Sequence, residues 1–408
     1  MYKTLHFDNL INAKIHISTM LKGYSRDAKI LIGANAAGQL FLQFSIFIMP
    51  FYLAALGYDM AQMGTFFSIQ TLVGGLFFLT AGQISLRLGY KKTLILSAIL
   101  GLAGRLLQVL AINYYVLALG FFLVGANMGL RQPNFSALLS EEVSDEQRHH
   151  AFSISFGLGT LFNAVGVLIA GFAPDFLINS LGITEDIAYR LVVSLALLQF
   201  VLVIPALVII HDVPVRNPKI NWNRELVVKI LKFSLPSALI GLGAGITIPY
   251  MSLYFKLRFG TTLTSISGVF FIQQLTMSLG SFGLPKLVER IGPVKVISLF
   301  QSTAAFLFII FPSIETFLLA ASLYILRSIL MNIVWPINDS FMMGFFNTEE
   351  KATASGIRRA FSTFMRGSGN YLGGILFGMS LSYPFYATAF LYIVATAIFY
   401  SFFIKHNK

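Results

Sequence analysis

The sequence predicts an all-α membrane protein in which twelve transmembrane helices form two pseudo-symmetric six-helix bundles. Three observations lead to this prediction. The chain of 408 residues is 56% hydrophobic and only 11% charged, whereas soluble proteins carry about 25% charged residues. Long apolar runs recur along the whole chain, and a spanning helix needs about 20 mostly apolar residues. Finally, the second half of the chain repeats features of the first.

The apolar runs define the expected helices in chain order. Each is long enough to cross a bilayer, and short polar turns separate most of them. We expect the helices at residues 29–57, 62–86, 91–112, 114–140, 150–172, 188–211, 235–258, 262–288, 294–312, 315–344, 353–381 and 384–404.

The remaining segments divide the chain into domains. Residues 1–28 are an N-terminal segment whose spaced apolar residues suit either a helix lying on the membrane surface or a frayed tail. The polar and basic stretch at 212–234 is expected to link the two bundles. The predicted organisation is 1–28 N-terminal segment, 29–211 N-terminal bundle, 212–234 linker, 235–404 C-terminal bundle and 405–408 tail.

The distribution of basic residues predicts the orientation. If the N-terminus is cytoplasmic, 22 of the 29 Lys and Arg residues fall in cytoplasmic segments. Only Arg190, Lys256 and Arg258 fall outside, and Arg105, Arg131, Arg327 and Arg366 fall within spans. Cytoplasmic loops of membrane proteins are enriched in Lys and Arg. Both termini are therefore expected in the cytoplasm, and the net charge of +12 reflects topology and lipid contact rather than nucleic-acid binding.

Several function classes lack sequence support. The chain has no cysteine, so disulfides, iron–sulfur clusters and thiol catalysis are excluded. The sequence has no phosphate-binding glycine loop and no clustered Cys and His ligands. A membrane-embedded enzyme or receptor would need clustered catalytic residues or a large extramembrane domain. We therefore expect no enzymatic activity, no cofactor and no metal.

An internal repeat relates the two halves. With a shift of 203 residues, Arg87 aligns with Arg290, Gly89 with Gly292, and Lys92 with Lys295. Pro133 and Pro336 align in the same register, and half of the chain length is 204 residues. A series of matches at a constant offset indicates a duplicated six-helix unit. Parallel repeats of this kind are common in secondary transporters.

The turn GQISLRLGYKK, residues 82–92, resembles the signature loop of the major facilitator superfamily. Gly82, Arg87, Gly89, Lys91 and Lys92 match that pattern, while Leu86 stands where the family has an acid. In the second copy the acid is present as Glu289, but Pro285 replaces the first glycine. The resemblance implies a cytoplasmic gate formed by Gly82, Arg87, Gly89, Lys92, Glu289, Arg290 and Gly292.

The resemblance also implies a central cavity lined by the first, fourth, seventh and tenth helices. A charge at the bilayer centre costs about 2.5–3.5 kcal/mol, so charged residues in these helices are site candidates. We expect substrate contacts from Asn35, Gln39, Gln43, Asn127, Arg131, Arg327, Trp335 and Asn338. Asp339 is the candidate for proton coupling, although it could instead pair with a nearby arginine.

The segment NAVGVLIAG, residues 163–171, partly resembles a signature of drug exporters in this superfamily. Gly166 and Gly171 match, but the proline and one glycine of that signature are absent. Small residues also permit close helix packing, and this second interpretation stays open. Helix packing is expected at Gly166, Gly171, Gly369, Gly373 and Gly374.

The resemblance implies a secondary transporter that works by alternating access, without a cofactor. Our first expectation is proton-coupled export of amphipathic compounds. The alternative is a carrier of organic anions or anionic lipids, favoured by the arginines within the spans. The expected partners are a small-molecule substrate, protons and the lipid bilayer, with no nucleic acid. The expected form is a monomer in a bacterial cytoplasmic membrane.

Overall fold

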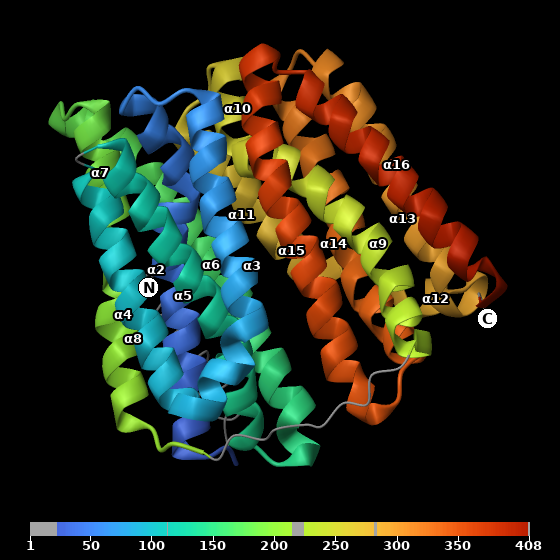
Figure 1. Cartoon of the computed structure of the whole chain (residues 1–408). Coiled ribbons are helices and arrows are strands. Elements are labelled where there is room, and N and C mark those ends of the chain that lie inside the picture. Colours follow the sequence, from blue (N-terminus) through green and yellow to red (C-terminus); the bar gives the residue numbers. More distant parts are fainter. Residues whose placement is uncertain (1–22, 112, 214–223, 281–283, 407–408) are drawn as a thin grey trace, which may run out of the picture.

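The computed structural model describes residues 23–111, 113–213, 224–280 and 284–406. Within these ranges all regular elements are helical (Figure 1). In the N-terminal half the helices are α2 (Arg26–Ala55), α3 (Met60–Leu88), α4 (Tyr90–Leu110), α5 (Tyr114–Glu141), α6 (Asp145–Leu181), α7 (Glu185–Leu195) and α8 (Leu198–Ile209). In the C-terminal half they are α9 (Arg224–Thr247), α10 (Met251–Phe259), α11 (Leu263–Gly280), α12 (Leu284–Ile291), α13 (Pro293–Ile310), α14 (Phe317–Met343), α15 (Thr348–Met379) and α16 (Tyr383–Phe403).

The chain passes back and forth between two faces. We call the face where α2 begins and α16 ends the terminal face, and the other the opposite face. Ten helical segments of the described chain are long and apolar enough to span a membrane. The other two expected spans correspond to α11 with α12, and to α15. Helix α15 is less apolar because it carries Arg358, Arg359 and Arg366.

Several helix boundaries differ from the expectations; α6, for example, extends to Leu181 rather than to residue 172. Two of the differences have a clear local cause. Helix α9 begins at Arg224, inside the expected linker, because Leu226, Ile230 and Phe233 form a buried stripe at helical spacing. Helix α2 begins at Arg26, where the side chain of Ser25 accepts a hydrogen bond from the Ala28 amide and caps the helix. Most of the expected N-terminal segment, residues 1–22, lies outside the described residues.

The turns between helices preserve the repeat. Gly57 and Gly260 have φ values of 85° and 60°, and Gly89 and Gly292 have φ values of 88° and 84°. Each pair is separated by 203 residues. Positive φ values are accessible to glycine at little cost but are strained for other residues. The repeat seen in the sequence therefore includes the backbone conformation of its turns.

The two halves lie side by side and meet along two helix pairs. In Figure 1 helices α2–α8 occupy the left side and α9–α16 the right side. Helix α3 packs against α15, and α6 packs against α11. These pairs are related by the same repeat, so the interface between the halves is itself pseudo-symmetric.

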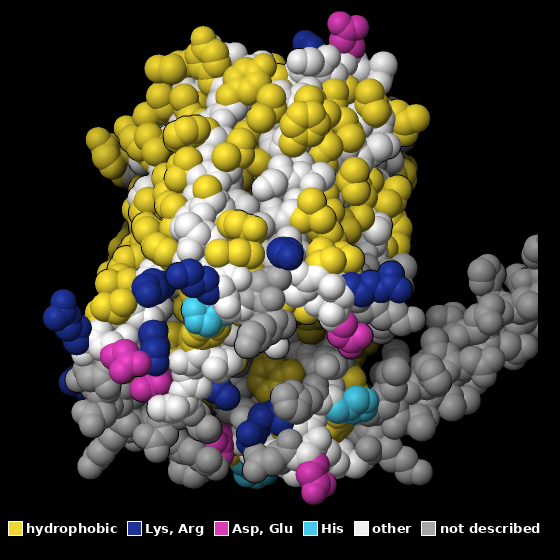
Figure 2. Space-filling view, turned by 90° about the vertical axis from the view of Figure 1, so that its right-hand side faces the viewer, with side chains coloured by type: hydrophobic (Ala, Val, Ile, Leu, Met, Phe, Trp, Pro, Cys, Tyr) yellow, Lys and Arg dark blue, Asp and Glu magenta, His cyan; other side chains and the backbone are white. Residues whose placement is uncertain are grey.

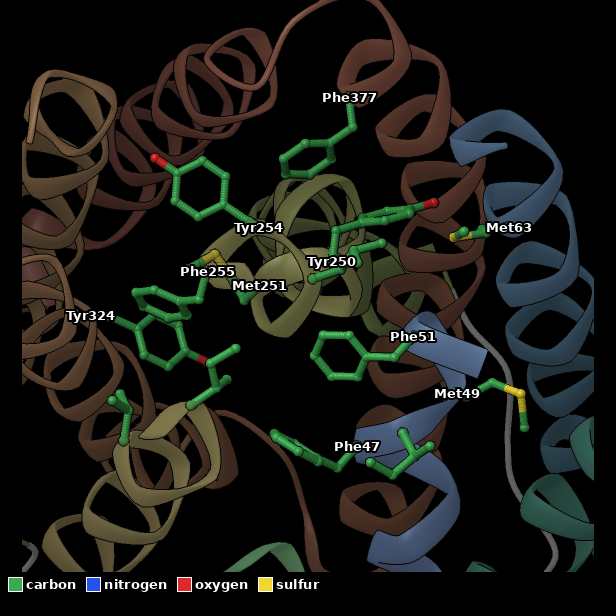
Figure 3. Packing of buried hydrophobic residues seen from close by; sticks show 14 of the residues in the cluster. Phe47, Met49, Phe51, Met63, Tyr250, Met251, Tyr254, Phe255, Tyr324 and Phe377 are labelled. Atoms are coloured by element: carbon green, nitrogen blue, oxygen red, sulfur yellow. The ribbon is translucent and has the colours of Figure 1, made fainter. Parts of the chain in front are cut away.

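Aromatic side chains fill the interface near the opposite face. Figure 3 shows Phe47 and Phe51 from α2 beside the segment that contains Tyr250 and Tyr254. The rings of Phe47 and Phe270 lie 5.7 Å apart, and those of Phe67 and Tyr250 lie 5.8 Å apart. Each pair joins the two halves, so the halves share one buried core at this face.

Figure 2 shows how charge is distributed on one side of the molecule. A broad hydrophobic zone covers most of the visible surface, and Lys and Arg side chains gather below it, toward the terminal face. The surface thus has the apolar band and basic edge of a protein that lies in a bilayer.

Candidate functional site

The first contact that closes the opposite face joins α3 and α15. The Asn370 side chain donates hydrogen bonds to the Phe67 carbonyl at 2.9 Å and to the Thr71 hydroxyl at 2.8 Å. Gly64 and Gly374 let the two backbones approach, because a side-chain carbon on Gly374 would collide with the Met60 carbonyl. Small residues permit this distance in membrane helices.

The second contact joins α6 and α11. The carboxylate of Asp175 accepts hydrogen bonds from the Thr264 amide at 2.8 Å and the Thr264 hydroxyl at 2.6 Å. Thr264 lies in the first turn of α11, where a negative charge is favoured by the helix dipole. Nearby, Gly171 lies directly against Ser267.

A third contact involves Lys256 at the end of α10. Its ammonium group lies 2.9 Å from the Tyr189 hydroxyl and 3.4 Å from the Glu185 carboxylate. Both partners belong to α7 in the other half. The opposite face is therefore closed by hydrogen bonds, an ion pair and the aromatic core.

At the terminal face, the expected gate residues form no hydrogen bond or ion pair with a described residue of the other half. The cross-half hydrogen bonds and the ion pair described above lie toward the opposite face. The expected gate residues Arg87, Lys92, Glu289 and Arg290 are exposed, each on its own half. The structure is thus closed at the opposite face and unlatched at the terminal face.

In the N half, the polar residues of α2 lie against α6. Gln43 donates to Asn163 at 2.9 Å, and Asn35 donates to Ser155 at 3.4 Å. Gln39 lies beside Gly159 of α6. The expected common face of Asn35, Gln39 and Gln43 is thus largely a helix-packing surface in this conformation.

Arg131 joins this cluster from α5. Its Nη1 donates to the side-chain Oδ1 atom of Asn35 at 3.2 Å. No carboxylate of the described residues forms an ion pair with Arg131. Its neighbour on the helix, Asn127, is buried and donates to the Ser97 carbonyl at 2.7 Å. Both residues line a cavity within the N half, between α2, α4, α5 and α8, whose space is about 490 Å³ when the adjoining open solvent is counted.

In the C half, Asp339 pairs with arginines of α15. It accepts from Arg358 through Oδ1, and its Oδ2 lies 3.5 Å from Arg359. The Arg358 guanidinium also lies 5.6 Å from the centre of the Trp335 ring. Trp335, Asn338 and Arg358 line a second cavity, the C-half cavity, whose space is about 410 Å³ when the adjoining open solvent is counted.

The two cavities are related by the internal repeat. Several residues that line one cavity have counterparts in the other at the repeat offset of 203 residues. The pairs are Ala34 and Ser237, Ala98 and Gln301, Arg131 and Val334, and Phe135 and Asn338. An arginine enters each cavity from a different helix, α5 in the N half and α15 in the C half.

Arg327 is placed differently from the expectation. It is only 4% exposed, its Nη2 donates to the Tyr392 hydroxyl at 2.6 Å, and its guanidinium lies 4.4 Å from the centre of the Phe308 ring. These partners belong to α16 and α13, so Arg327 lies inside the C half. Two aromatic faces there stabilise its charge.

Arg366 and Arg105 occupy contrasting environments. Arg366 is exposed, on α15 between the side that packs on α9 and the side that packs on α3. That position faces the space between the halves. Arg105 is buried in the N half and donates to Ser45 and to Gln108.

The expected packing glycines all lie at close helix contacts. Gly166 lies against the Leu40 carbonyl, Gly369 against Leu242 and Gly373 against Ile246, each within one half. Gly171 and Gly374 instead lie between the halves. The same residue type therefore supports both the bundles and their interface.

Sequence reasoning missed two residues. Arg358 was counted with the cytoplasmic segments, but it is 1% exposed and paired with Asp339. Its Nη1 also lies 3.3 Å from the Ser237 hydroxyl. The signal was the lone Asp339 in an apolar run, which requires a cation. The second residue is Asp212, whose carboxylate lies beside Gly89 and Lys91 at the signature turn.

The described residues contain no group of three His, Cys, Asp or Glu side chains that could hold a metal ion. The polar atoms of the site are instead guanidinium, amide and hydroxyl groups with one carboxylate. This set suits hydrogen bonding and charge pairing with an organic ligand.

Comparisons with known proteins are consistent with this architecture. The family model of the Major Facilitator Superfamily matches residues 31–236 and again residues 233–408. No curated protein sequence matches the chain.

Among solved structures, a bacterial homolog of the human lysosomal transporter Spinster, in an inward-facing and unoccupied conformation, has a TM-score of 0.73 at 13% identity, covering 95% of this chain and 99% of that one. The nucleoside transporter NupG has a TM-score of 0.71 at 14% identity, covering 93% and 99%. The POT family transporter PepTSo has a TM-score of 0.72 at 12% identity, covering 94% and 98%. These matches confirm the predicted fold class.

Proposed function

The chain belongs to the major facilitator superfamily, and from this premise we propose that it is a secondary active transporter of organic anions. It works by alternating access, in which the two halves rock about a site between them. The observation that carries the proposal is the one-sided closure of the interface. Hydrogen bonds seal the opposite face, at Asn370 and Asp175, while the terminal face is unlatched.

The orientation follows from the basic residues. We take the terminal face as cytoplasmic, because Lys and Arg gather there. The structure then represents the inward-facing state of a protein with cytoplasmic termini, in a bacterial cytoplasmic membrane and as a monomer. The two functional domains are the N half and the C half, joined by the linker that begins after α8.

The charge of the site supports an anionic substrate. Arg131 lines the N-half cavity, and Arg366 faces the space between the halves. Neither forms an ion pair with a described carboxylate. Asp339 shares its single charge between Arg358 and Arg359. The excess positive charge would repel a cation and attract an anion.

Asp339 also supports a second candidate, proton-coupled export of amphipathic compounds. It is a partly exposed carboxylate between two arginines, within a segment long enough to span the membrane. Carboxylates in such positions commonly serve proton relays in transporters. The partial exporter signature at Gly166 and Gly171 points in the same direction.

Transport by purified protein in proteoliposomes tests both candidates. Benzoate and benzylammonium, which differ mainly in charge, are offered with and without an imposed pH gradient. Saturable transport of benzoate is expected, and benzylammonium uptake should remain at the level of empty liposomes. The reverse preference would refute the anion proposal. Stimulation by the pH gradient beyond that seen in empty liposomes, or its absence, decides whether protons take part.

A further inference from the structure

A buried arginine in the C half retains a free hydrogen-bond donor. Arg358 is 1% exposed. Its Nη1 donates to the Ser237 hydroxyl at 3.3 Å and its Nη2 donates to Asp339, but its Nε has no partner. An unsatisfied donor in a buried position is destabilising, more so when it is charged. A ligand acceptor at Nε would remove this cost.

The surroundings of Arg358 define the ligand that fits. The C-half cavity combines Arg358 and Asn338 with the apolar side chains of Ile240, Met331, Val334, Trp335 and Phe399. The Oδ1 atom of Asn338 is also buried without a partner. The cavity therefore suits a molecule with one anionic group and an apolar or aromatic body. Trp335, which is 39% exposed, offers a ring face for stacking.

The geometry of a guanidinium group makes Asp339 a competitor. A carboxylate binds arginine most strongly through two parallel hydrogen bonds, and one such pair consists of Nε and Nη2. In the structure Oδ1 of Asp339 already accepts from Nη2, while its Oδ2 lies 3.5 Å from Arg359. A ligand carboxylate that engages both Nε and Nη2 must displace Asp339 from Nη2.

We propose that Arg358 binds the carboxylate of an apolar or aromatic monocarboxylate in the C-half cavity, and that Asp339 competes for the same guanidinium. This inference rests on the proposed transport of organic anions and assigns its substrate contact. Asp339 lowers the affinity for the substrate. It also re-forms its ion pair on release, so the arginine is never left without a counter-charge.

The two tryptophans of the sequence, Trp222 and Trp335, make a direct test simple. In a Trp222→Phe background, Trp335 is the only tryptophan and reports on Arg358 beside it. Benzoate is titrated into purified full-length protein in detergent, with benzamide as the neutral control. Trp335 fluorescence gives the dissociation constant. The variants are Asp339→Asn and Arg358→Lys. The matched control is Arg224→Lys, at the exposed first residue of α9.

The proposal expects benzoate to bind and benzamide not to bind. Asp339→Asn should tighten benzoate binding about tenfold or more, because the neutral amide competes poorly for the guanidinium. Arg358→Lys should weaken binding at least tenfold, because lysine lacks the paired donors. Arg224→Lys should leave it unchanged. If Asp339→Asn does not elute as a single peak, Asp339→Ala is measured instead.

Three outcomes would overturn the proposal. Binding that is unchanged or weaker in Asp339→Asn would remove Asp339 as a competitor. Equal binding of benzamide and benzoate would show that no anionic contact is made. If benzoate bound neither to the Trp222→Phe protein nor to its Asp339→Asn variant, the cavity would not be a binding site. If proteoliposomes still transport benzoate in any of these cases, only the assignment to Arg358 fails. If transport is also absent, the proposed function fails with it.

Discussion

The carboxylate of Asp212 lies at the start of helix α4, where a side-chain carbon on Gly89 would come within 2.7 Å of its Oδ2 atom. Asp212 also accepts from the Lys91 amide at 3.4 Å. The Lys91 ammonium donates to the carbonyls of Val208 and Ile210 at 2.8 and 2.6 Å, at the end of α8. The signature turn, at the start of α4, is therefore bound to the end of α8 and to the residues that follow it.

This relationship predicts a coupled effect of Gly89→Ala. Gly89 has φ 88° and ψ 158°, a conformation that costs other residues about 1–3 kcal/mol. The added methyl group would also collide with Asp212. We expect Gly89→Ala to lower the thermal midpoint in detergent by several degrees, measured by fluorescence-detected size exclusion after heating.

Two comparisons separate strain from collision. Gly57→Ala places an alanine at an existing positive φ, where the side-chain carbon meets nothing within 4 Å. It should lower the thermal midpoint less than Gly89→Ala does. In an Asp212→Ala background, Gly89→Ala should also cost less than in the wild type. Equal costs in all three settings would show that Asp212 does not crowd Gly89.

How far the sequence predicted this region depended on distance along the chain. Helix spans and repeated turns are local properties, and apolar length and the 203-residue offset revealed them. Leu86 stands where the family has an acid, yet an acid from a distant part of the chain, Asp212, lies against the turn. Nothing in the sequence indicates that the end of α8 returns to the start of α4, because that proximity arises only from packing.

The same distinction applies to the candidate site. Arginines within apolar runs were recognisable as site candidates, but their partners were not. Arg358 lies near the start of the helix expected at 353–381 and was therefore assigned to the cytoplasmic side, whereas α15 begins ten residues earlier at Thr348. Arg327 was expected to face the central cavity, but helical spacing alone could not show that Phe308 and Tyr392 would enclose it.

The glycine contact between the halves predicts a state-selective variant. A methyl group on Gly374 would collide with the Met60 carbonyl and lie 3.0 Å from the Gly64 Cα atom. Gly374→Ala should therefore disfavour closure of the opposite face and abolish transport, while the halves themselves fold normally. Spin labels at Asn113→Cys and Thr316→Cys, possible without background because the chain has no cysteine, should report longer distances.

The matched control is Gly378→Ala, one turn further along α15, where the added carbon meets Met60 only at 4.0 Å. It should retain both transport and the wild-type distance distribution. If both variants behaved alike, close approach at Gly374 would have no part in closure.

Asn370 predicts a graded effect at the same face. Its side chain makes two hydrogen bonds across the interface, and each contributes about 0.5–1.5 kcal/mol. Asn370→Ala should shift the distribution toward opposite-face opening by about tenfold, since 1.4 kcal/mol is tenfold in population. Asn332→Ala is the control, because Asn332 bonds only to Ser328 within its own helix at 2.7 Å. Unaltered spin-label distances in Asn370→Ala would show that these two hydrogen bonds do not stabilise the closed opposite face.

Arg131 predicts the behaviour of the N-half cavity. It is a guanidinium without a described ion-pair partner, held by Asn35 at 3.2 Å. If it attracts the anionic substrate, Arg131→Gln should raise the KM for benzoate about tenfold and change the maximal rate less. Arg190→Gln, at an exposed position in the middle of α7, controls for loss of a positive charge. An unchanged KM in Arg131→Gln would limit the anion contact to the C half.

The last prediction concerns the loops at the terminal face. Leu86 is 44% exposed, and Glu289 is exposed and forms no ion pair with a described residue of the other half. Any cross-half ion pair from these positions therefore forms only when the terminal face closes, so a substitution here changes the energy of that state alone. Leu86→Asp should favour terminal-face closure, and Glu289→Gln should disfavour it. A partly buried pair at a helix end can contribute more than the roughly 0–1 kcal/mol of a surface pair. Labels at Ser144→Cys and Gly344→Cys measure the change, and identical distributions in all three proteins would mean that these loops set topology only.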